Sequence, residues 1–462
     1  MSLLTPAAPI APVHEATTPP AAVARQGSSF VSEPPRLVGA DLRVPTRQGA
    51  QVYGNLDHGA STPALFAVKQ AVEATLETYA SVHRGAGWAS RVTSAWYEQA
   101  RDEVARFVGA RPDDEVLFTR TTTDSWNLLA RALPDDAVVF VFESEHHSTL
   151  LPWEAIRTVR LPIPSSIDEA LALLDRGLEA HLAAVRLVVV TAASNVTGEI
   201  WPVARLAEIA HSHGARIAVD AAQLAAHRAV DLAAWDVDYV AFSGHKVYAP
   251  FGAGVLAGPR DWLDAGEPYL AGGGATRSVS QFSTIWQTGP ARHEGGSPNV
   301  VGAIALAAAC ATIARHRPAI EAHEAHLLDR LRSGLAAIPG LRRLQIFGGD
   351  ADLVGVVTFT VPGLDPSLVS QALSWEHGVG VRDGKFCAHL LVDRLLGIEQ
   401  PLTTAVRASI GLGTTEEAVD RLVGGVRRLV EIGPLDEWTH GASGWTLAAG
   451  DPRDPAAVLP PW

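Results

Sequence analysis

A lysine directly after a buried strand, with an aspartate at the end of an earlier strand, is the feature of this sequence best suited to chemistry. Ser243-Gly244-His245-Lys246 follows the apolar run 238–242, and Asp220-Ala221-Ala222-Gln223 ends a similar run upstream. An amine in an apolar environment loses its proton more easily than an exposed one, and it can then form a Schiff base with an aldehyde. A carboxylate nearby can keep a heteroaromatic nitrogen protonated, so that the ring withdraws electrons. The set therefore predicts carbanion chemistry on an aldehyde cofactor.

Pyridoxal phosphate is the aldehyde cofactor that these side chains suit. Lys246 would supply the amine and Asp220 the acid partner of the pyridine nitrogen, while His245 adds an imidazole and Ser243 a hydroxyl. The alternatives are ordinary: a surface lysine whose alkyl stem packs on the protein, and an aspartate that caps a turn. The buried strand before Lys246 argues against the first of them.

A second candidate site lies at residues 120–127, where a strand is predicted to give way to a helix. The first amides of a helix lack intrahelical acceptors and lie at the positive end of the helix dipole, so they bind phosphate readily. Thr122 and Thr123 would add hydroxyl ligands there. N-capping of the helix by one of the threonines is the structural alternative.

Length and composition set the class of protein. The chain has 462 residues, 47% of them hydrophobic, so it can bury a large core and divide into a major and a minor domain. Its formal charge of −13 disfavours nucleic acid and anionic membranes as partners. No apolar stretch approaches the roughly 20 residues of a membrane span. The two cysteines, Cys310 and Cys387, suggest a reducing compartment. We therefore expect a cytoplasmic protein, and no metal site is indicated.

Helical and strand patterns alternate from about residue 60, as in a parallel sheet with helices on its faces. Residues 64–79 and 123–133 are predicted to be helical. Strands are predicted where short runs are almost entirely apolar, which is typical of strands buried on both faces. These runs are 115–118, 138–142, 187–190, 216–219, 239–242 and 255–256.

The character of the chain changes beyond residue 299, where a smaller α+β domain is predicted. Its expected helices are 303–316, 320–338, 367–375 and 415–431, and its expected strands are 344–347 and 354–359. The predicted regions are a flexible Ala/Pro-rich leader over 1–50, a large cofactor-binding domain over 51–298, a small C-terminal domain over 299–432 to which the N-terminal segment contributes, and an irregular tail over 433–462.

These residues resemble, in order along most of the chain, the class V, fold-type I pyridoxal phosphate enzymes, and within them the group II cysteine desulfurases and selenocysteine lyases. The resemblance implies an α/β fold whose large domain has a mainly parallel seven-stranded sheet flanked by helices, plus a smaller α+β C-terminal domain. The matching segments are Asn55 to Ser61, His83 to Gly85, Tyr97-Glu98, Thr122-Thr123, Glu145 to His147, Ser194-Asn195, Asp220 to Gln223, Ser243 to Lys246, Gly295 to Asn299, Arg382, Cys387 and Arg407 to Ser409.

The resemblance also implies cofactor-binding roles. Lys246 matches the lysine that forms the internal Schiff base and moves protons at the substrate α-carbon, and Asp220 matches the pyridinium partner. Gln223 matches the side chain that bonds the cofactor's phenolic oxygen. His146 matches the imidazole that stacks over the ring and assists proton movement, and Asn195 matches a side chain near the cofactor or substrate.

The remaining implied ligands concern the phosphate and a second subunit. Ser243 and His245 match phosphate ligands, together with the threonine pair Thr122 and Thr123. Ser297 aligns with a hydroxyl that reaches the phosphate of the neighbouring subunit. The resemblance therefore implies a homodimer.

Cys387 determines which reaction the resemblance implies. Arg407 aligns with the arginine that binds the substrate carboxylate, a task suited to a planar bidentate donor, and Arg382 aligns with another active-site arginine. Cys387 holds the position of the desulfurase nucleophile, which takes sulfur or selenium from L-cysteine or L-selenocysteine as a persulfide and leaves alanine. Lys385 and His389 are near enough in sequence to favour its thiolate. A sulfur-acceptor protein is then an expected partner.

Departures from the family pattern keep other readings open. Lys385-Phe386 stands where a histidine pair is usual, Thr121 where glycine begins the phosphate turn, and His58-Gly59 where a small polar residue and alanine are usual. One alternative is another class V reaction, such as that of an amino-acid epimerase, aminotransferase or C–S lyase, that does not use Cys387. For Cys387 itself, the structural alternative is a small buried core residue. The other is a non-catalytic scaffold that keeps only the fold.

Overall fold

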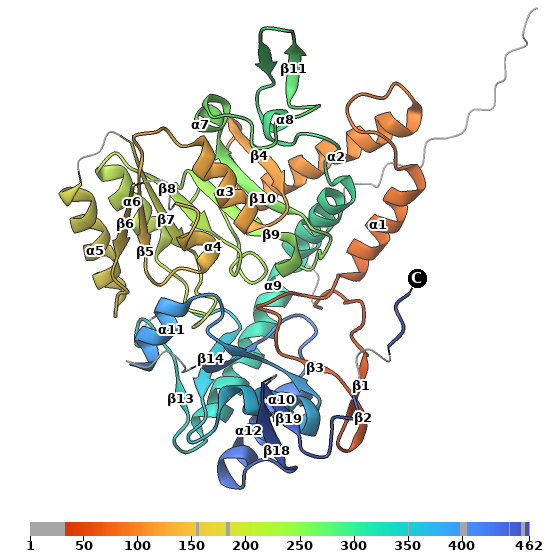
Figure 1. The fold of residues 1–462 in the computed structure, drawn as a ribbon, viewed down its shortest axis with the longest axis vertical. Coiled ribbons are helices and arrows are strands. Elements are labelled where there is room, and N and C mark those ends of the chain that lie inside the picture. The colour runs from red at the N-terminus through yellow and green to blue at the C-terminus, as the bar shows by residue number, and fades with distance from the viewer. Residues whose placement is uncertain are drawn as a thin grey trace, which may run out of the picture.

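The computed structural model describes residues 33–153, 157–181, 185–349, 351–397, 404–442, 444–453 and 458–461. Two parts pack together in Figure 1: a sheet covered by helices above, and a smaller group of helices and strands below. One long helix, α9 (Val300–Ala336), runs from the upper part into the lower part.

The larger part is built on seven strands in the order β4-β10-β9-β8-β7-β5-β6. The pairs among β9, β8, β7, β5 and β6 are parallel, whereas β10 is antiparallel to both its neighbours. The predicted α/β fold with a mainly parallel seven-stranded sheet is therefore confirmed. The strands are β4 (Asp114–Thr119), β5 (Val138–Phe142), β6 (Arg157–Leu161), β7 (Arg186–Thr191), β8 (Arg216–Asp220), β9 (Tyr239–Ser243) and β10 (Gly254–Pro259).

Helices cover both faces of this sheet, because its strands are apolar on both sides; every residue of β5 and β9 is buried. Each predicted strand was found, and β6, which is half-exposed at the sheet edge, was missed. The helices are α1 (Phe66–Thr78), α2 (Trp88–Phe107), α3 (Thr122–Ala132), α4 (His147–Leu150), α5 (Ile167–Ala180), α6 (Val203–Ser212), α7 (Arg260–Ala265) and α8 (Pro290–His293).

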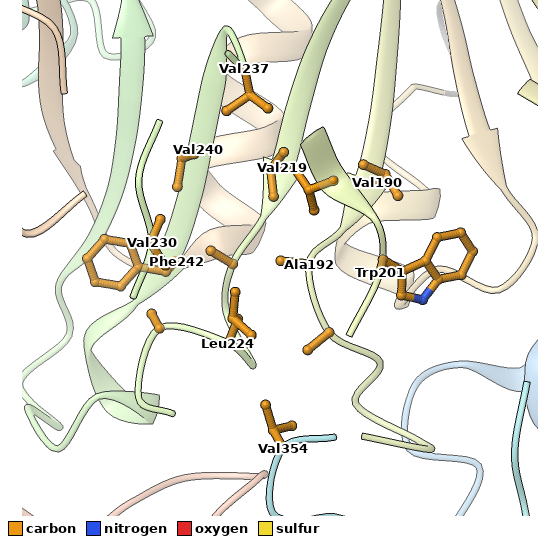
Figure 2. Close-up of a cluster of buried hydrophobic side chains, with 14 of the residues drawn as sticks. Val190, Ala192, Trp201, Val219, Leu224, Val230, Val237, Val240, Phe242 and Val354 are labelled. Atoms are coloured by element: carbon orange, nitrogen blue, oxygen red, sulfur yellow. The ribbon is translucent and has the colours of Figure 1, made fainter. Parts of the chain in front are cut away.

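The main hydrophobic core continues from the sheet into the smaller part. Figure 2 shows Val190, Val219 and Val240 side by side on neighbouring strands, with Trp201 beside them. Val354, which comes from the segment leading into the small sheet, closes the cluster from below. The two parts therefore share one core, which fixes their relative position around the cavity between them.

Helix α9 corrects the predicted pair of helices at 303–316 and 320–338. It is one helix of 37 residues with Pro318 inside it. Its first half belongs to the core of the larger part and packs on α1 and α2, and its second half belongs to a separate core with α12 (Glu416–Glu431). The division between the parts therefore falls within α9, and not at residue 299. Its length and composition would suit a membrane span, but its packing is that of a core helix.

The smaller part has a four-stranded sheet in the order β13-β14-β17-β16, with helices packed against it. The run 344–347 does not form the predicted strand. The backbone amides of Ile346 and Phe347 donate hydrogen bonds to the Glu199 carboxylate at 2.6 and 2.8 Å, so they do not pair with a neighbouring strand. The elements are β13 (Arg342–Arg343), β14 (Val356–Thr360), α10 (Pro366–His377), β16 (Arg382–Gly384), α11 (His389–Leu396) and β17 (Ala405–Ser409); β15 (Val379–Gly380) pairs in parallel with β3 (Gly54–Asn55).

Both terminal regions contain hairpins that the sequence did not predict. Residues 1–32 of the predicted leader lie outside the described residues, but β1 (Arg43–Thr46) and β2 (Gly49–Val52) form a hairpin near the end of it. The tail predicted to be irregular contains β18 (Trp438–Gly441) and β19 (Gly444–Leu447). Arg47 of the first hairpin pairs with Asp436 beside the second, at 3.1 Å. Both hairpins therefore belong to the folded smaller part.

A third hairpin, β11 (Thr276–Val279) and β12 (Thr284–Trp286), projects from the larger part.

Candidate active site

A cavity of about 250 Å³ lies where the carboxyl ends of the parallel strands meet the smaller part. Ligands of open α/β sheets commonly bind at this edge, because the strand ends bring polar loop residues together there. All the predicted site residues except Ser297 line it: Thr122, Thr123, His146, Asn195, Asp220, Gln223, Ser243, His245, Lys246, Arg382, Cys387 and Arg407.

Asp220, the last residue of β8, presents a buried and oriented carboxylate. Its Oδ2 accepts a hydrogen bond from Thr149 Oγ1 at 2.6 Å, and its Oδ1 accepts one from the amide of Ala222 at 2.9 Å. The neighbouring carboxyl group of Glu145 is buried, and burial raises its pKa well above the usual range, with the Asp220 charge raising it further. Glu145 therefore favours its neutral form, and Asp220 is the carboxylate offered to the cavity.

Lys246 ends the 3-10 turn η1 (Gly244–Lys246) that follows β9. Burial lowers the pKa of its amine to about 8; the Asp220 carboxylate opposes this effect, and Arg407 adds to it. A lysine with such a pKa holds a useful neutral fraction near physiological pH. Its amine is therefore suited to act as a nucleophile and as a base.

His146 is held as a neutral imidazole beside the lysine. It caps the short helix α4, and its Nδ1 accepts a hydrogen bond from the amide of Ser148 at 3.0 Å. The acceptor role of Nδ1 leaves the ring proton on Nε2. Burial and, to a smaller extent, the charge of Lys246 lower the His146 pKa to about 3. The ring therefore stays uncharged over the physiological range.

The first turn of α3 meets the end of β9 at the cavity. Thr121 caps the helix, so the capping alternative is correct for that residue, while Thr122 and Thr123 line the cavity. The amide and the hydroxyl of Thr122 each lie 2.8 Å from Ser243 Oγ. The φ of Thr121 is −159°, an extended conformation that needs no glycine. Gly254 makes the room instead, because a Cβ there would lie 2.7 Å from Thr121 Cα.

The smaller part contributes a pair of arginines. Arg382 of β16 and Arg407 of β17 are directly opposite each other in the antiparallel register. Arg407 is only 2% exposed; its Nη1 donates to the carbonyl of Asn195 at 3.0 Å and its Nη2 to Asp57 Oδ1 at 3.1 Å. Arg382 Nη1 lies 3.6 Å from Asp57 Oδ2. The pair forms a cationic site suited to a carboxylate.

Cys387 lies in a loop of unusual backbone between β16 and α11. Phe386 and Cys387 have φ angles of 52° and 54°, a region that residues other than glycine rarely adopt. Two hydrogen bonds hold the loop: Asn195 Nδ2 donates to the carbonyl of Phe386 at 2.8 Å, and the amide of His147 donates to the carbonyl of Cys387 at 2.7 Å. Cys387 is a free, exposed thiol on the cavity wall. The fold thus presents the thiol and does not bury it as core.

The residues around the thiol differ from the expectation. Lys385 forms an ion pair with Asp393 of α11 at 2.6 Å, so its charge is already balanced. The Phe386 ring packs under the Arg407 guanidinium, 5.1 Å from its centroid. His389 packs edge-on against His147, with ring centroids 4.6 Å apart, and burial and the His389 charge lower the His147 pKa.

Two residues that the sequence analysis singled out lie away from this cavity. Ser297 lines a separate cavity of about 280 Å³ beside Tyr269. The side chain of His58, which departs from the family pattern, is buried against Gly411 and does not line the cavity, whereas Gly59 does. The room left by Gly411 accounts for this, because a Cβ at that position would lie 2.3 Å from the His58 ring.

Three residues of the site were not predicted. Thr149, which orients Asp220, lies two residues after the predicted histidine pair and carries no signal of its own. Asp57 belongs to a matched segment, but its contacts join parts of the chain 350 residues apart. Phe386 looked like a departure from the family pattern, and its packing under Arg407 appears only in the fold.

The cavity suits pyridoxal phosphate on the evidence of its own groups. Asp220 offers an oriented carboxylate, Gln223 is buried with its Oε1 unpaired among the described residues, and Lys246 offers an amine of lowered pKa. The amides and hydroxyls at the start of α3 add a phosphate-binding edge. Acid partner, amine and phosphate edge thus surround one cavity.

Comparison with known proteins supports this assignment. The family model for aminotransferase class-V matches residues 54–422. The chain belongs to the aminotransferase class-V family, whose members depend on pyridoxal phosphate.

Several of the relatives and solved structures that match are named cysteine desulfurases. A cysteine desulfurase of Dickeya dadantii is 36% identical over 368 residues, which cover 77% of this chain and 86% of that enzyme. A cysteine desulfurase of Synechococcus elongatus is 35% identical over 359 residues; the match covers 76% of this chain but 56% of the relative, so this chain spans just over half of its length. The solved Escherichia coli cysteine desulfurase CsdA matches with a TM-score of 0.71 at 32% identity, over 86% of this chain and 99% of that one.

Proposed function

We propose that this chain is a pyridoxal phosphate-dependent cysteine desulfurase that removes sulfur from L-cysteine, or selenium from L-selenocysteine, and releases alanine. The observation that carries the proposal is the free thiol of Cys387, which lines the same cavity as Arg407 and Lys246. A class V reaction that did not use this thiol would gain nothing from exposing it on a loop of rare backbone conformation.

The chain's own groups divide the work. Bound pyridoxal phosphate supplies the electron sink that makes the substrate α-carbon acidic. Arg407 binds the substrate carboxylate, and Asp220 keeps the pyridine nitrogen protonated. Lys246 removes the α-proton, which its pKa of about 8 permits near neutral pH. The neutral ring of His146 would lie against bound cofactor and could offer its Nε2 proton.

Sulfur transfer falls to Cys387. Its thiolate attacks the substrate sulfur, so that a sulfur–sulfur bond forms and the carbon–sulfur bond breaks. The electron pair of the broken bond stays on the substrate carbon, which takes up a proton and becomes the methyl group of alanine. A thiol of an acceptor protein then removes the sulfur from the enzyme persulfide, and the exposure of Cys387 leaves it within reach of such a partner.

The other matched residues hold the cofactor. Ser243, His245 and the Thr122-Thr123 turn would bind the phosphate, and Gln223 would bond the phenolic oxygen. Asn195 acts through the loop, because its amide is used to hold the carbonyl of Phe386. Arg382 assists Arg407 at the carboxylate.

A homodimer would complete the site. Ser297 cannot contribute to the cavity of its own chain from its separate position, but it can serve a second copy. The hairpin of β11 and β12, which projects from the larger part in Figure 1, carries exposed apolar side chains, a surface that suits an interface; they are Val279, Phe282 and Ile285. A reducing compartment, and hence the cytoplasm, suits the free thiol.

The deciding experiment is incubation of the purified holoenzyme with L-cysteine and a reducing acceptor thiol. We expect sulfide and alanine in equal amounts, and a persulfide on Cys387 by mass spectrometry when the acceptor is omitted. Keto acid, racemised cysteine, or pyruvate with ammonia would instead assign one of the other class V reactions. L-selenocysteine should be consumed by the same route.

A further inference from the structure

The arginine pair already holds a carboxylate that belongs to the chain. Asp57 shares its two oxygens between the pair: Oδ1 accepts from Arg407 Nη2 at 3.1 Å, and Oδ2 lies 3.6 Å from Arg382 Nη1. Two cations placed directly opposite each other on paired strands repel one another. A shared carboxylate between them offsets that repulsion.

Asp57 is fixed in this position by its backbone. It forms an isolated bridge with Ser409 of β17, two residues beyond Arg407. The amide of Ser409 donates to the carbonyl of Leu56 at 2.6 Å, and the Asp57 amide donates to Asn55 Oδ1 at 3.0 Å. The carboxylate is therefore a built part of the strand pair and not a surface side chain that happens to reach it.

The remaining donor capacity suits one further carboxylate. Nη1 and Nη2 of Arg407 are used by Asn195 and Asp57, while Nε has no partner among the described residues although it is buried. Arg382 is half-exposed and faces the same cavity. With Asp57 between them, the two arginines and the aspartate leave one net positive charge. A single substrate carboxylate is enough to neutralise it.

We propose that Asp57 sets the substrate class of this site, because it neutralises the arginine pair to the point where an amino acid with an uncharged side chain binds and one with a second carboxylate is disfavoured. This inference rests on the proposed function for its choice of amino acids as ligands. Without Asp57, Arg382 would be free to accept a second anionic group on the substrate.

The test compares L-aspartate with L-asparagine, which have nearly the same shape and differ by one charge. Each is titrated into the holoenzyme while the visible absorbance of the bound cofactor is followed, which gives a dissociation constant that does not depend on turnover. In Asp57→Asn the ratio of the two constants, aspartate over asparagine, should fall by about tenfold, the effect of freeing one partly desolvated cation.

Asp383→Asn is the matched control. Asp383 neighbours Arg382 on β16, but its carboxylate accepts from Ser370 and does not line the cavity, so the same change of charge should leave the ratio unaltered. A ratio in Asp57→Asn within twofold of wild type, or equal weakening of both ligands, would overturn the proposal.

A second variant guards against misfolding of the first. Arg382→Gln removes the cation that a second carboxylate would use, so the ratio should rise above that of wild type; an unchanged ratio would also overturn the proposal. The proposed function is tested separately by sulfide and alanine release from L-cysteine. A wild-type enzyme that fails to release them but shows the predicted ratios would lose its function assignment and keep the role of Asp57.

Discussion

The two walls of the cavity are built in different ways. On the larger part, Asp220, Ser243 and Lys246 stand at or just after the ends of buried parallel strands, and neighbouring hydrogen bonds fix the carboxylate. On the smaller part, Cys387 stands on an exposed loop with two consecutive positive φ angles. That loop is held by side-chain and backbone contacts from the opposite wall. The comparison suggests that activation of the substrate is built into the sheet, while the outcome depends on a loop.

Replacing Lys246 should have the largest effect. Lys246→Ala removes both the nucleophile and the base, so alanine release from L-cysteine should fall by at least about 10³-fold. The visible absorbance of the bound cofactor should be lost as well. Lys69→Ala on the exposed face of α1 is the control and should match wild type. A variant that kept more than a tenth of its activity would place the first step elsewhere.

Replacing Cys387 should distinguish the contribution of the smaller part from that of the larger part. Cys387→Ser should lower sulfide release by about 10²-fold or more, because a hydroxyl cannot carry the sulfur. The cofactor absorbance should persist, since the larger part is untouched. Cys310→Ala changes the other thiol, which is buried in α9, and should retain activity. Wild-type consumption of cysteine by Cys387→Ser would exclude the persulfide route.

The lowered pKa of Lys246 should determine how the rate of cofactor binding by the apoprotein depends on pH. Because only the neutral amine reacts and its pKa is about 8, the capture rate should rise with pH and level off above 8, and each unit below should cost roughly tenfold. Stopped-flow absorbance from pH 6 to 9.5 measures this. Pyridoxamine phosphate, which has no aldehyde, is the control ligand. A rate that keeps rising to pH 9.5 would mean that the lysine pKa is not lowered.

Removing a hydrogen bond between the larger part and the Cys387 loop should lower activity moderately. Asn195→Ala removes the hydrogen bond to the carbonyl of Phe386, which is worth about 1 kcal/mol, so sulfide release should fall roughly fivefold. Cofactor affinity should change little. Equal losses in cofactor binding and in sulfide release would show that Asn195 serves the cofactor directly.

The smallest effect should come from Glu145, whose pKa burial raises well above the usual range. Between its unfolded and folded pKa values the native state keeps a proton that the unfolded chain has lost, so this group's contribution to stability falls as pH rises. Glu145→Gln cannot ionise, so its Tm should decline less than that of wild type from pH 5 to 8, with activity within about twofold. Glu143→Gln, two residues earlier, is the control. Parallel Tm curves would mean that Glu145 is charged.

Much of the catalytic wall on the larger part could be predicted because its signals are local. The apolar runs that mark β8 and β9 are followed at once by Asp220 and Lys246, and parallel strands bring their carboxyl ends to one edge. Local patterns failed where partners are distant. Glu199 captures the amides of Ile346 and Phe347 from 147 and 148 residues away and prevents the predicted strand.

The sequence by itself determined the α/β class and the placement of Asp220 and Lys246, because these depend on periodicity and on residue types close together in the chain, and its resemblance to a known family predicted the remaining groups around the cofactor. Only the tertiary structure decided that Asp57 joins Arg382 and Arg407, that His58 turns away from the cavity, and that Phe386 packs under Arg407. Each of these contacts joins segments that are far apart in the chain or in neighbouring strands. These side chains come into contact only after the two parts have packed on α9, so no local sequence pattern predicts their contacts.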